Sequence, residues 1–426
     1  MPDRCSVLFY PRGQSEPILA GELRLLPGMK GSVFQYARSY LYNRLAIALD
    51  PIALPLHGGE IVTLRSDNSL IPDVFSDAGP DAWGRLVIDR VSNLERKSEF
   101  DYLLAAGSNR AGALDFCIDG QTRKPAAMQM SELADIEMAI DRIRMKLPIE
   151  ESHRLLLAPG TSVGGMRPKT LVELDGSLWI AKFNARDEDL DAVSMEYAGM
   201  TLAKQCGLHV APVYKHQLKD IFEGAHADKR IVLLVRRFDR APLGNGHYGR
   251  IPYISARTLL RGYAKETEGA VPSEYSYVVL ADALRRVAVA DTLSTDLREL
   301  FRRMVFNILI DNTDDHERNH GLLFEQGWRL APGFDISSQT TGLGYQAMCV
   351  AAQSTDSSLI NARSECGRFG LRQEEAKNLV DELIASTESL ETFYVNAGVE
   401  TEQTAHVAQT RQRIVSAYAK TGFLPR

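Results

Sequence analysis

The 426-residue sequence is poor in cysteine, and its few cysteines form no recognisable site. They lie far apart, and no two of them form a C-x-x-C pair. The five are Cys5, Cys117, Cys206, Cys349 and Cys366. An odd, dispersed set provides neither a disulfide framework nor a zinc cluster. We therefore expect a protein of a reducing compartment.

Long hydrophobic runs are also absent. No stretch approaches the roughly 20 apolar residues that a membrane-spanning helix requires. The first residues, from Met1 to Cys5, lack the charged-then-apolar pattern of an export signal. The sequence predicts a cytoplasmic protein with no membrane partner.

The chain has no excess of positive charge. It contains 49 lysines and arginines against 55 aspartates and glutamates, which gives a formal net charge of −6. A mildly acidic chain has no global reason to bind nucleic acid by itself. Basic pairs such as Arg236-Arg237 and Arg302-Arg303 are expected to be solvated or ion-paired. Composition alone indicates a globular protein and goes no further.

The order of predicted elements divides the chain into three parts. Residues 1–125 are typical of short strands followed by helices, with one helix expected over residues 34–49. Residues 126–245 are β-rich. Residues 246–426 repeat apolar positions at intervals of three and four, which indicates helices. We predict an α+β fold with an N-terminal subdomain, a β-rich lobe and a helical lobe at these boundaries.

The clearest local pattern is a hairpin in the β-rich lobe. Two β-favouring runs, residues 170–174 and 178–183, flank Asp175-Gly176, which predicts a type I′ turn. Lys182 lies on the second strand and shares an apolar face with Leu178 and Ile180 by period two. A lysine there needs a carboxylate or a phosphate as partner.

Phosphoryl transfer places charge around three phosphates, and the required parts occur here in the order that protein kinases use. A glycine-rich stretch from Gly160 to Gly165 could bring backbone N–H groups close to phosphate oxygens. It is no Walker A loop, because Met166 follows where lysine is needed. Glu196, on the next predicted helix, is the expected partner of Lys182. Taken alone, the loop could equally be an ordinary turn.

The strongest chemical pattern comes late in the chain. Asp314 and Asn319 have the spacing of a kinase catalytic loop, in which the aspartate accepts the hydroxyl proton and the asparagine binds Mg²⁺. Two short predicted strands then lead to Asp335, where kinases place a metal-binding aspartate. Acidic residues crowded at 311, 314 and 315 repel one another unless a cation lies among them. The alternative is a solvated acidic turn.

A second motif overlaps these residues. His316-Glu317-Arg318-Asn319-His320 matches H-E-x-x-H, the zinc metalloprotease signature. That signature requires a helix, on which the two histidines share one face. The polar residues 311–315 have no apolar stripe, so a loop is expected and the protease interpretation is disfavoured.

The motifs together resemble those of the HipA family of serine/threonine kinase toxins. The similar segments are residues 162–170, residues 312–320 with 330–336, the stretch Leu234-Val235-Arg236-Arg237-Phe238-Asp239-Arg240, and Pro80-Asp81-Ala82-Trp83-Gly84-Arg85 with residues 103–114. The resemblance runs nearly end to end. It departs from the family pattern at Arg167-Pro168 and at Arg236.

This resemblance implies a two-lobed, protein-kinase-like fold that uses ATP and Mg²⁺. It implies Asp314 as catalytic base, Asn319 and Asp335 as metal ligands, and Ser162 as a site of autophosphorylation that inactivates the enzyme. The residues expected to bind the nucleotide are Ser162, Val163, Gly164, Gly165, Lys169, Lys182, Glu196, Arg236, Phe238, His316, Asn319 and Asp335.

The resemblance also implies partners. The expected substrate is a protein, as in the archetype, where it is an aminoacyl-tRNA synthetase. A small helix-turn-helix antitoxin of the HipB type is expected, and operator DNA would be bound through it. Two other interpretations stay open: a weakly active or inactive kinase-fold partner of a repressor, and a small-molecule kinase.

Overall fold

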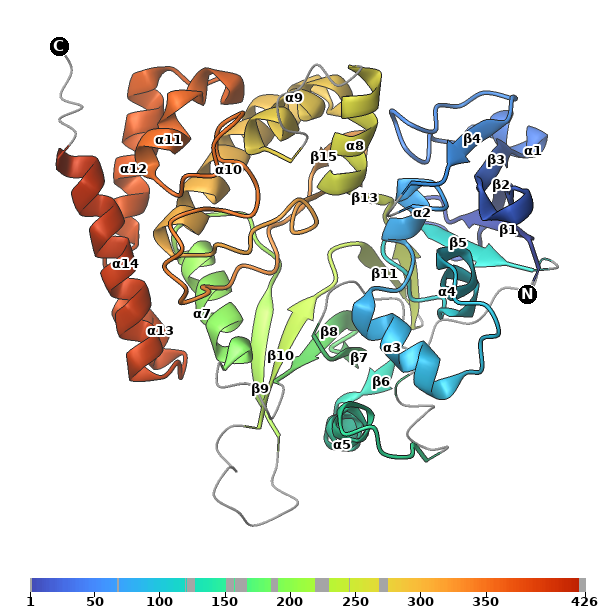
Figure 1. Ribbon diagram of the computed structural model, residues 1–426, viewed down its shortest axis with the longest axis horizontal. Helices are drawn as coiled ribbons and strands as arrows, with labels where there is room; N and C mark the ends of the chain where they lie inside the picture. Colours follow the sequence, from blue (N-terminus) through green and yellow to red (C-terminus); the bar gives the residue numbers. More distant parts are fainter. Residues whose placement is uncertain are drawn as a thin grey trace. The chain divides into compact units, whose positions relative to one another are not determined.

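The structure is a computed structural model that describes residues 2–66, 69–118, 120, 127–150, 157, 167–184, 191–218, 230–244, 246–267 and 275–420. The chain forms two compact units (Figure 1). The first contains Met1–Glu188, Lys215–Ile254 and Leu323–Glu325. The second contains Asp189–Tyr214, Ser255–Leu322 and Gln326–Arg426. The subdomain boundaries at 125 and 245 stay predictions.

The first unit begins with an antiparallel sheet in the order β4-β3-β2-β1-β5. Its strands are β1 (Arg4–Phe9), β2 (Ile18–Leu25), β3 (Gly31–Tyr36), β4 (Ile61–Leu64) and β5 (Leu114–Cys117). The connecting helices are η1 (Pro27–Met29), α1 (Arg38–Leu41), α2 (Asp73–Asp77), α3 (Ala82–Val91) and α4 (Glu99–Ala105). Rings of Phe34, Phe75 and Phe116 meet edge to face in the core, with centroids 5.1 and 5.3 Å apart.

The helix predicted over residues 34–49 is wrong. Strand β3 continues to Tyr36, and only the four-residue helix α1 follows. The Tyr36 hydroxyl donates to the Leu54 carbonyl at 2.7 Å and accepts from the Leu49 N–H at 3.0 Å. Tertiary packing of the aromatic residues overrides their helix-like spacing, because buried rings and hydroxyl bonds hold this segment against the sheet.

Asp50 is a buried carboxylate in this layer. It is 1% exposed, and its Oδ1 accepts the N–H groups of Ile52 and Ala53, both at 2.9 Å. Burial raises the pKa of Asp50 to about 6, although these backbone bonds oppose the rise.

We expect this group to make stability depend on pH. Between pH ~4 and ~6 the native state keeps a proton that the unfolded chain releases, so the free energy of unfolding falls as pH rises. Asp50→Asn should abolish this fall, leaving the variant more stable than the wild type above pH 6 by roughly 3 kcal/mol. Urea unfolding at pH 4.5 and 7.5 measures the free energy of unfolding of both proteins. If the variant and the wild type differed in this free energy by the same amount at both pH values, the prediction would be wrong.

A second sheet in the first unit has the order β6-β7-β8-β10-β9. Its strands are β6 (Met128–Gln129), β7 (Lys169–Leu174), β8 (Ser177–Phe183), β9 (Val213–Gln217) and β10 (Ile231–Arg236). The predicted type I′ turn is confirmed, since Asp175 and Gly176 have φ of 49° and 63°. Helix η2 (Met130–Glu132) and helix α5 (Leu133–Arg144) precede β7, and β11 (Arg240–Gly244) and β12 (His247–Arg250) form a hairpin after β10.

The core of this second sheet includes a helix from the N-terminal part of the chain. Trp83 and Val87 of α3 pack in one cluster with Ile136 and Ile140 of α5 and with Phe183 of β8. The N-terminal region therefore contributes to the sheet that carries Lys182, which the periodicity of the sequence did not indicate.

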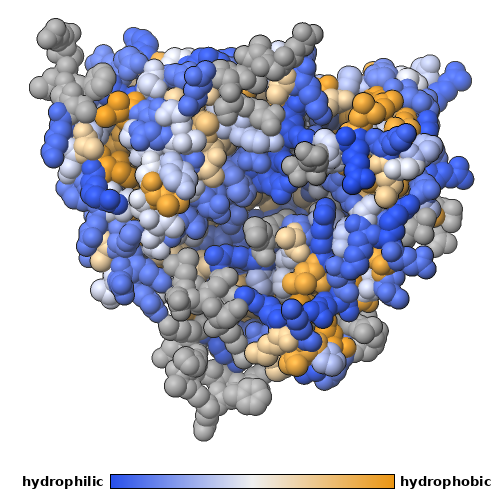
Figure 2. Space-filling view, viewed as in Figure 1, coloured by the Kyte–Doolittle hydropathy of each residue, from blue (hydrophilic) through white to orange (hydrophobic). Residues whose placement is uncertain are grey.

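The surface of the first unit exposes some apolar side chains. On the edge strand β4, Val62 and Leu64 are 54% and 71% exposed, and hydrophobic residues gather over this strand in Figure 2. Among the described residues, no helix has the length and apolarity needed to cross a membrane.

The second unit is mostly helical, as predicted. Its helices are α7 (Ala192–Gln205), α8 (Ala256–Glu266), α9 (Tyr277–Val287), α10 (Ala290–Leu309), α11 (Leu359–Ser364), η5 (Cys366–Phe369), α12 (Gln373–Ser386), α13 (Leu390–Asn396) and α14 (Thr401–Lys420). Strand β13 (Tyr253–Ser255) leads into α8, and β14 (Gly321–Phe324) and β15 (Trp328–Leu330) follow the predicted catalytic loop. Helix α10 is buried over most of its second half, so the loop starts from a fixed helix end.

Candidate active site

The predicted catalytic loop begins where α10 ends. Asp311 adopts a φ of +56°, which turns the chain out of the helix. Its carbonyl accepts the N–H groups of Thr313 and Gln339, both at 3.0 Å, and its carboxylate accepts the Gly342 N–H at 3.1 Å. Burial raises the pKa of this carboxyl. Asp311 therefore fixes the loop to the segment that follows Asp335.

Residues 311–320 contain no helix. His316 and His320 therefore do not share a helical face, as the zinc protease signature requires, and the predicted loop is confirmed. His320 instead bonds Asp315 through Nε2 at 3.0 Å. Within the part of the chain that the structure describes, no cluster of three or more His, Cys, Asp or Glu side chains could hold a metal ion.

The two adjacent aspartates of the loop differ in burial. Asp314 is exposed, whereas Asp315 is 2% exposed and is bonded by the Tyr277 hydroxyl and by His320. The rings of Tyr277 and His320 meet edge to face at 5.3 Å. Asp315 thus anchors the loop, and Asp314 is left as the carboxylate that an acceptor could reach.

Asn319 is oriented by its own loop. Its Nδ2 donates to the Asp314 carbonyl at 3.3 Å, and its N–H donates to the His316 carbonyl at 2.9 Å. The amide nitrogen is therefore directed at the loop backbone, and the role of Oδ1 as a metal ligand stays a prediction. The side chain is 7% exposed, so this orientation is constrained.

The backbone brings the Asp335 segment back to Asn319. The Ala331 N–H donates to the Gly321 carbonyl at 2.8 Å, two residues beyond Asn319 and four before Asp335. Asp335 is half-buried and has a φ of +59°. Aspartate is one of the few non-glycine residue types that adopt this conformation readily.

Helix α7 packs against the same segment. A Cβ on Gly199 would lie 2.4 Å from the Ile336 carbonyl oxygen, so only glycine allows this approach. Glu196, buried at 3% exposure, lies one turn earlier on α7. The second unit therefore contains Glu196, Asp314, His316, Asn319 and Asp335.

We predict that Gly199→Ala disturbs the Asp335 segment. The added methyl group cannot fit, so α7 or residue 336 must shift, at a cost of about 1–3 kcal/mol. The melting temperature should fall, and so should the rate of the phosphate transfer that the sequence predicts. Gly367→Ala is the matched control, because a Cβ there meets no atom within 4 Å. Equal behaviour of the two variants would contradict the prediction.

The first unit contains the remaining predicted residues that the structure describes. Lys182 on β8 is half-buried and pairs in register with Lys169 on β7 and Leu233 on β10. Two lysines directly opposite each other repel unless anions lie nearby. Lys169 has one such anion, since its Nζ lies 2.8 Å from Asp81 Oδ2. Its predicted contact with a nucleotide stays a prediction.

Strand β10 ends at an exposed residue, and buried residues follow it. Arg236 is exposed at the end of the strand, and the Phe238 ring lies 6.1 Å from the Tyr253 ring. Arg237 is buried and pairs with Asp239 at 2.6 Å.

On helix α10, Arg302 pairs with Glu382 at 3.1 Å. For Arg237 and Arg302 the expected ion pairing is confirmed.

Ser162, Val163, Gly164 and Gly165 lie outside the residues that the structure describes. The anchoring roles of Asp315 and Asp81 were not predicted from the sequence. Asp81 belongs to the motif of residues 80–85, but nothing in the sequence links it to Lys169.

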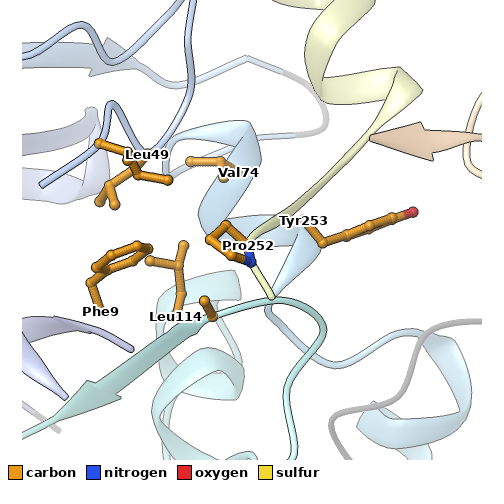
Figure 3. A pocket seen from close by; sticks show the side chains of 8 residues that line it. Phe9, Leu49, Val74, Leu114, Pro252 and Tyr253 are labelled. Carbon is orange, nitrogen blue, oxygen red and sulfur yellow. The ribbon is translucent and has the colours of Figure 1, made fainter. Parts of the chain in front are cut away.

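Two hollows of the first unit are lined by none of the predicted site residues. One lies in the N-terminal layer, where Phe9, Leu49, Val74 and Leu114 point toward one another beside Pro252 (Figure 3). It is too small for a nucleotide. A wider surface hollow is lined by Tyr36, Tyr42, His57 and neighbouring residues.

The fold belongs to the two-lobed, protein-kinase-like α+β class, as predicted. The chain superposes on the HipA chain of a Shewanella oneidensis complex of HipA, HipB and operator DNA, with a TM-score of 0.65, 17% identity and 97% of each chain covered. The model of the HipA-like C-terminal domain matches residues 161–390, and that of the HipA N-terminal domain matches residues 16–117. The match to the C-terminal domain spans more than half of the chain, so the protein belongs to the HipA family.

Two curated relatives come from Sinorhizobium fredii, and the names of both propose a kinase. Y4mE is 29% identical over 289 residues, which cover 62% of this chain and 63% of that protein. Y4dM is 23% identical over 313 residues, which cover 72% of each. The chain thus aligns with a little under two thirds of the length of Y4mE.

Proposed function

We propose that the protein is an ATP- and Mg²⁺-dependent serine/threonine protein kinase, the toxin of a HipA/HipB-like pair. The observation that carries this proposal is the arrangement of the loop after α10. Buried Asp315 anchors it, Asp314 stays exposed, and the Asn319 amide nitrogen donates to the loop backbone, so that the amide oxygen is the atom that would bind a metal ion. A scaffold without catalysis has no need of this division between adjacent carboxylates.

In this proposal Asp314 is the general base. An exposed carboxylate can accept the proton of a serine or threonine hydroxyl as that oxygen attacks the γ-phosphorus. The carbonyl of the same residue accepts the Asn319 amide N–H, so the base and the metal ligand are fixed relative to each other.

Asn319 and Asp335 would hold Mg²⁺. Magnesium is usually bound by one or two carboxylates together with substrate phosphates and water, so an amide oxygen and one carboxylate fit it without a larger acidic cluster. The bound cation would neutralise charge on the β- and γ-phosphates. The donor set, an amide oxygen and a carboxylate, fits magnesium better than zinc, which prefers histidine and cysteine ligands.

Lys182, with Glu196 as its proposed ion-pair partner, would bind the phosphates, and Arg236 and Phe238 would contact the base. Lys182 and Lys169 are register partners on β8 and β7, and the charge of Lys169 is already paired with Asp81, so Lys182 carries the phosphate contact in this assignment. Lys169 and His316 are proposed as further nucleotide contacts, together with the loop of Ser162, Val163, Gly164 and Gly165.

The finer assignments follow the family. We propose a protein acceptor, with an aminoacyl-tRNA synthetase as first candidate, and autophosphorylation of Ser162. A phosphate on that loop would repel the nucleotide phosphates. A HipB-like antitoxin is supported by the similar fold of a HipA that was solved with HipB and operator DNA. Through such a partner this acidic chain would reach DNA, in the cytoplasm.

The test is incubation of the full chain with labelled ATP and Mg²⁺, followed by phosphosite mapping in cells that express it without an antitoxin. Label on Ser162 and on a cellular protein, with growth arrest, supports the proposal. Transfer of label to small metabolites alone would favour the small-molecule kinase. No transfer at all would favour an inactive partner in repression.

A further inference from the structure

The N-terminal motif Pro80-Asp81-Ala82-Trp83-Gly84-Arg85 has no role in the function proposed above. In the structure its residues contact Lys169, the first residue of β7. Lys169 follows four residues after Gly165, the last residue of the stretch expected to form the phosphate loop. The motif therefore meets the chain at the start of β7.

Three bonds fix this point. The Lys169 ammonium group lies 2.8 Å from Asp81 Oδ2, and the Trp83 indole N–H donates to the Lys169 carbonyl at 3.2 Å. The Phe183 N–H donates to the neighbouring Pro168 carbonyl at 3.1 Å. Two of the three come from the N-terminal domain, over 80 residues earlier in the chain.

The bonds lie in a dry environment, where they are strong. The Lys169 side chain is 1% exposed and that of Asp81 is 13% exposed. The ring of Trp83 is packed in the core with α5 and β8. A buried ammonium group without its carboxylate would be costly, so the pair resists separation.

Asp81 also fixes the start of α3. Its Oδ1 accepts the Gly84 N–H at 2.7 Å as an N-cap while its Oδ2 pairs with Lys169. The same carboxylate thus joins the helix that carries Trp83 to the start of β7.

The N-terminal domain holds the segment after β10 as well. Arg237 donates to the carbonyls of Asn109 and Arg110 at 2.8 and 2.7 Å, and Asp239 accepts the Gly112 N–H at 2.8 Å. Burial alone would raise the pKa of Asp239, but Arg237 and Arg240 outweigh it and hold the pKa below its usual range. This second contact lies beside Arg236 and Phe238, which are proposed to meet the base.

We propose that Asp81 and Trp83 are positioning residues for ATP: they hold Lys169 at the start of β7, in register with Lys182 on β8, so that the affinity for the triphosphate depends on the N-terminal domain. This inference rests on the proposed kinase function. The adenine contacts have their own anchor at Arg237 and Asp239, so the two parts of the nucleotide can be tested separately.

The experiment compares binding of ATP and of adenosine to the full chain by calorimetry, with Mg²⁺ present. Asp81→Asn keeps an N-cap of equal quality and removes the charge that holds Lys169. Trp83→Phe keeps a buried ring and removes the indole N–H. Each should weaken ATP binding about tenfold and leave adenosine binding within about twofold of wild type.

Asp135→Asn is the matched control, since Asp135 is exposed in the first turn of α5 in the same unit. Equal loss of ATP and adenosine binding would indicate general damage to the fold and overturn the inference. So would unchanged ATP binding in both variants. Failure of the wild-type chain to bind ATP would instead contradict the proposed function itself.

Discussion

Asp314→Ala should reduce phosphate transfer by about 10²–10⁴-fold, which is the usual contribution of a general base. Asp314 is exposed and contributes only its backbone carbonyl to the described loop contacts, so truncating its side chain leaves the Asn319 bond in place. We therefore expect nearly unchanged melting and nearly unchanged ATP affinity, with the loss confined to kcat. Labelled ATP and a phosphorylation time course measure it.

A matched control is Arg318→Ala, which changes an exposed side chain of the same loop. It should retain activity close to that of the wild type. Full activity in Asp314→Ala would show that another group accepts the proton. Loss of activity in both variants would indicate that the loop tolerates no substitution, and the assignment of the base would then lose its support.

Asp335→Asn should reduce transfer by about 10²–10³-fold and raise the Mg²⁺ concentration needed for half-maximal activity. Asparagine tolerates the φ of +59° as well as aspartate does, so the backbone keeps its conformation while the charged ligand is lost. Raising Mg²⁺ should recover part of the activity, which a general folding defect would not allow.

The control for this change is Asp381→Asn on the surface of α12. It removes a carboxylate that pairs with Lys377 at 2.6 Å, and surface pairs contribute about 0–1 kcal/mol. Its Mg²⁺ dependence should match the wild type. If Asp335→Asn showed the same Mg²⁺ midpoint as this control, Asp335 would not be a metal ligand.

Local sequence patterns predicted the parts of the fold that depend on neighbours in the chain. The Asp175-Gly176 turn needed only two residues that accept positive φ, and the helices of the second unit followed from apolar spacing. The spacing of Asp314 and Asn319 likewise indicated one loop. Two residues that are five positions apart in the sequence must also lie close together in space.

Contacts between distant segments could not be read in this way. The aromatic residues over 34–49 have helix-like spacing, yet the Tyr36 hydroxyl bonds with Leu49 and Leu54 hold the segment outside a helix. Lys169 was predicted to meet a nucleotide, and the structure gives it a carboxylate partner 88 residues away.

The sequence by itself determined the class of fold, the family and the order of the chemical groups. These depend on residue types and their spacing within short segments of the chain. Only the tertiary structure decided which of two adjacent aspartates is buried. Tyr277 and His320, from a helix and a loop end, surround Asp315 and leave Asp314 exposed. Burial depends on tertiary packing, and two adjacent residues of the same type give no indication of which one is buried.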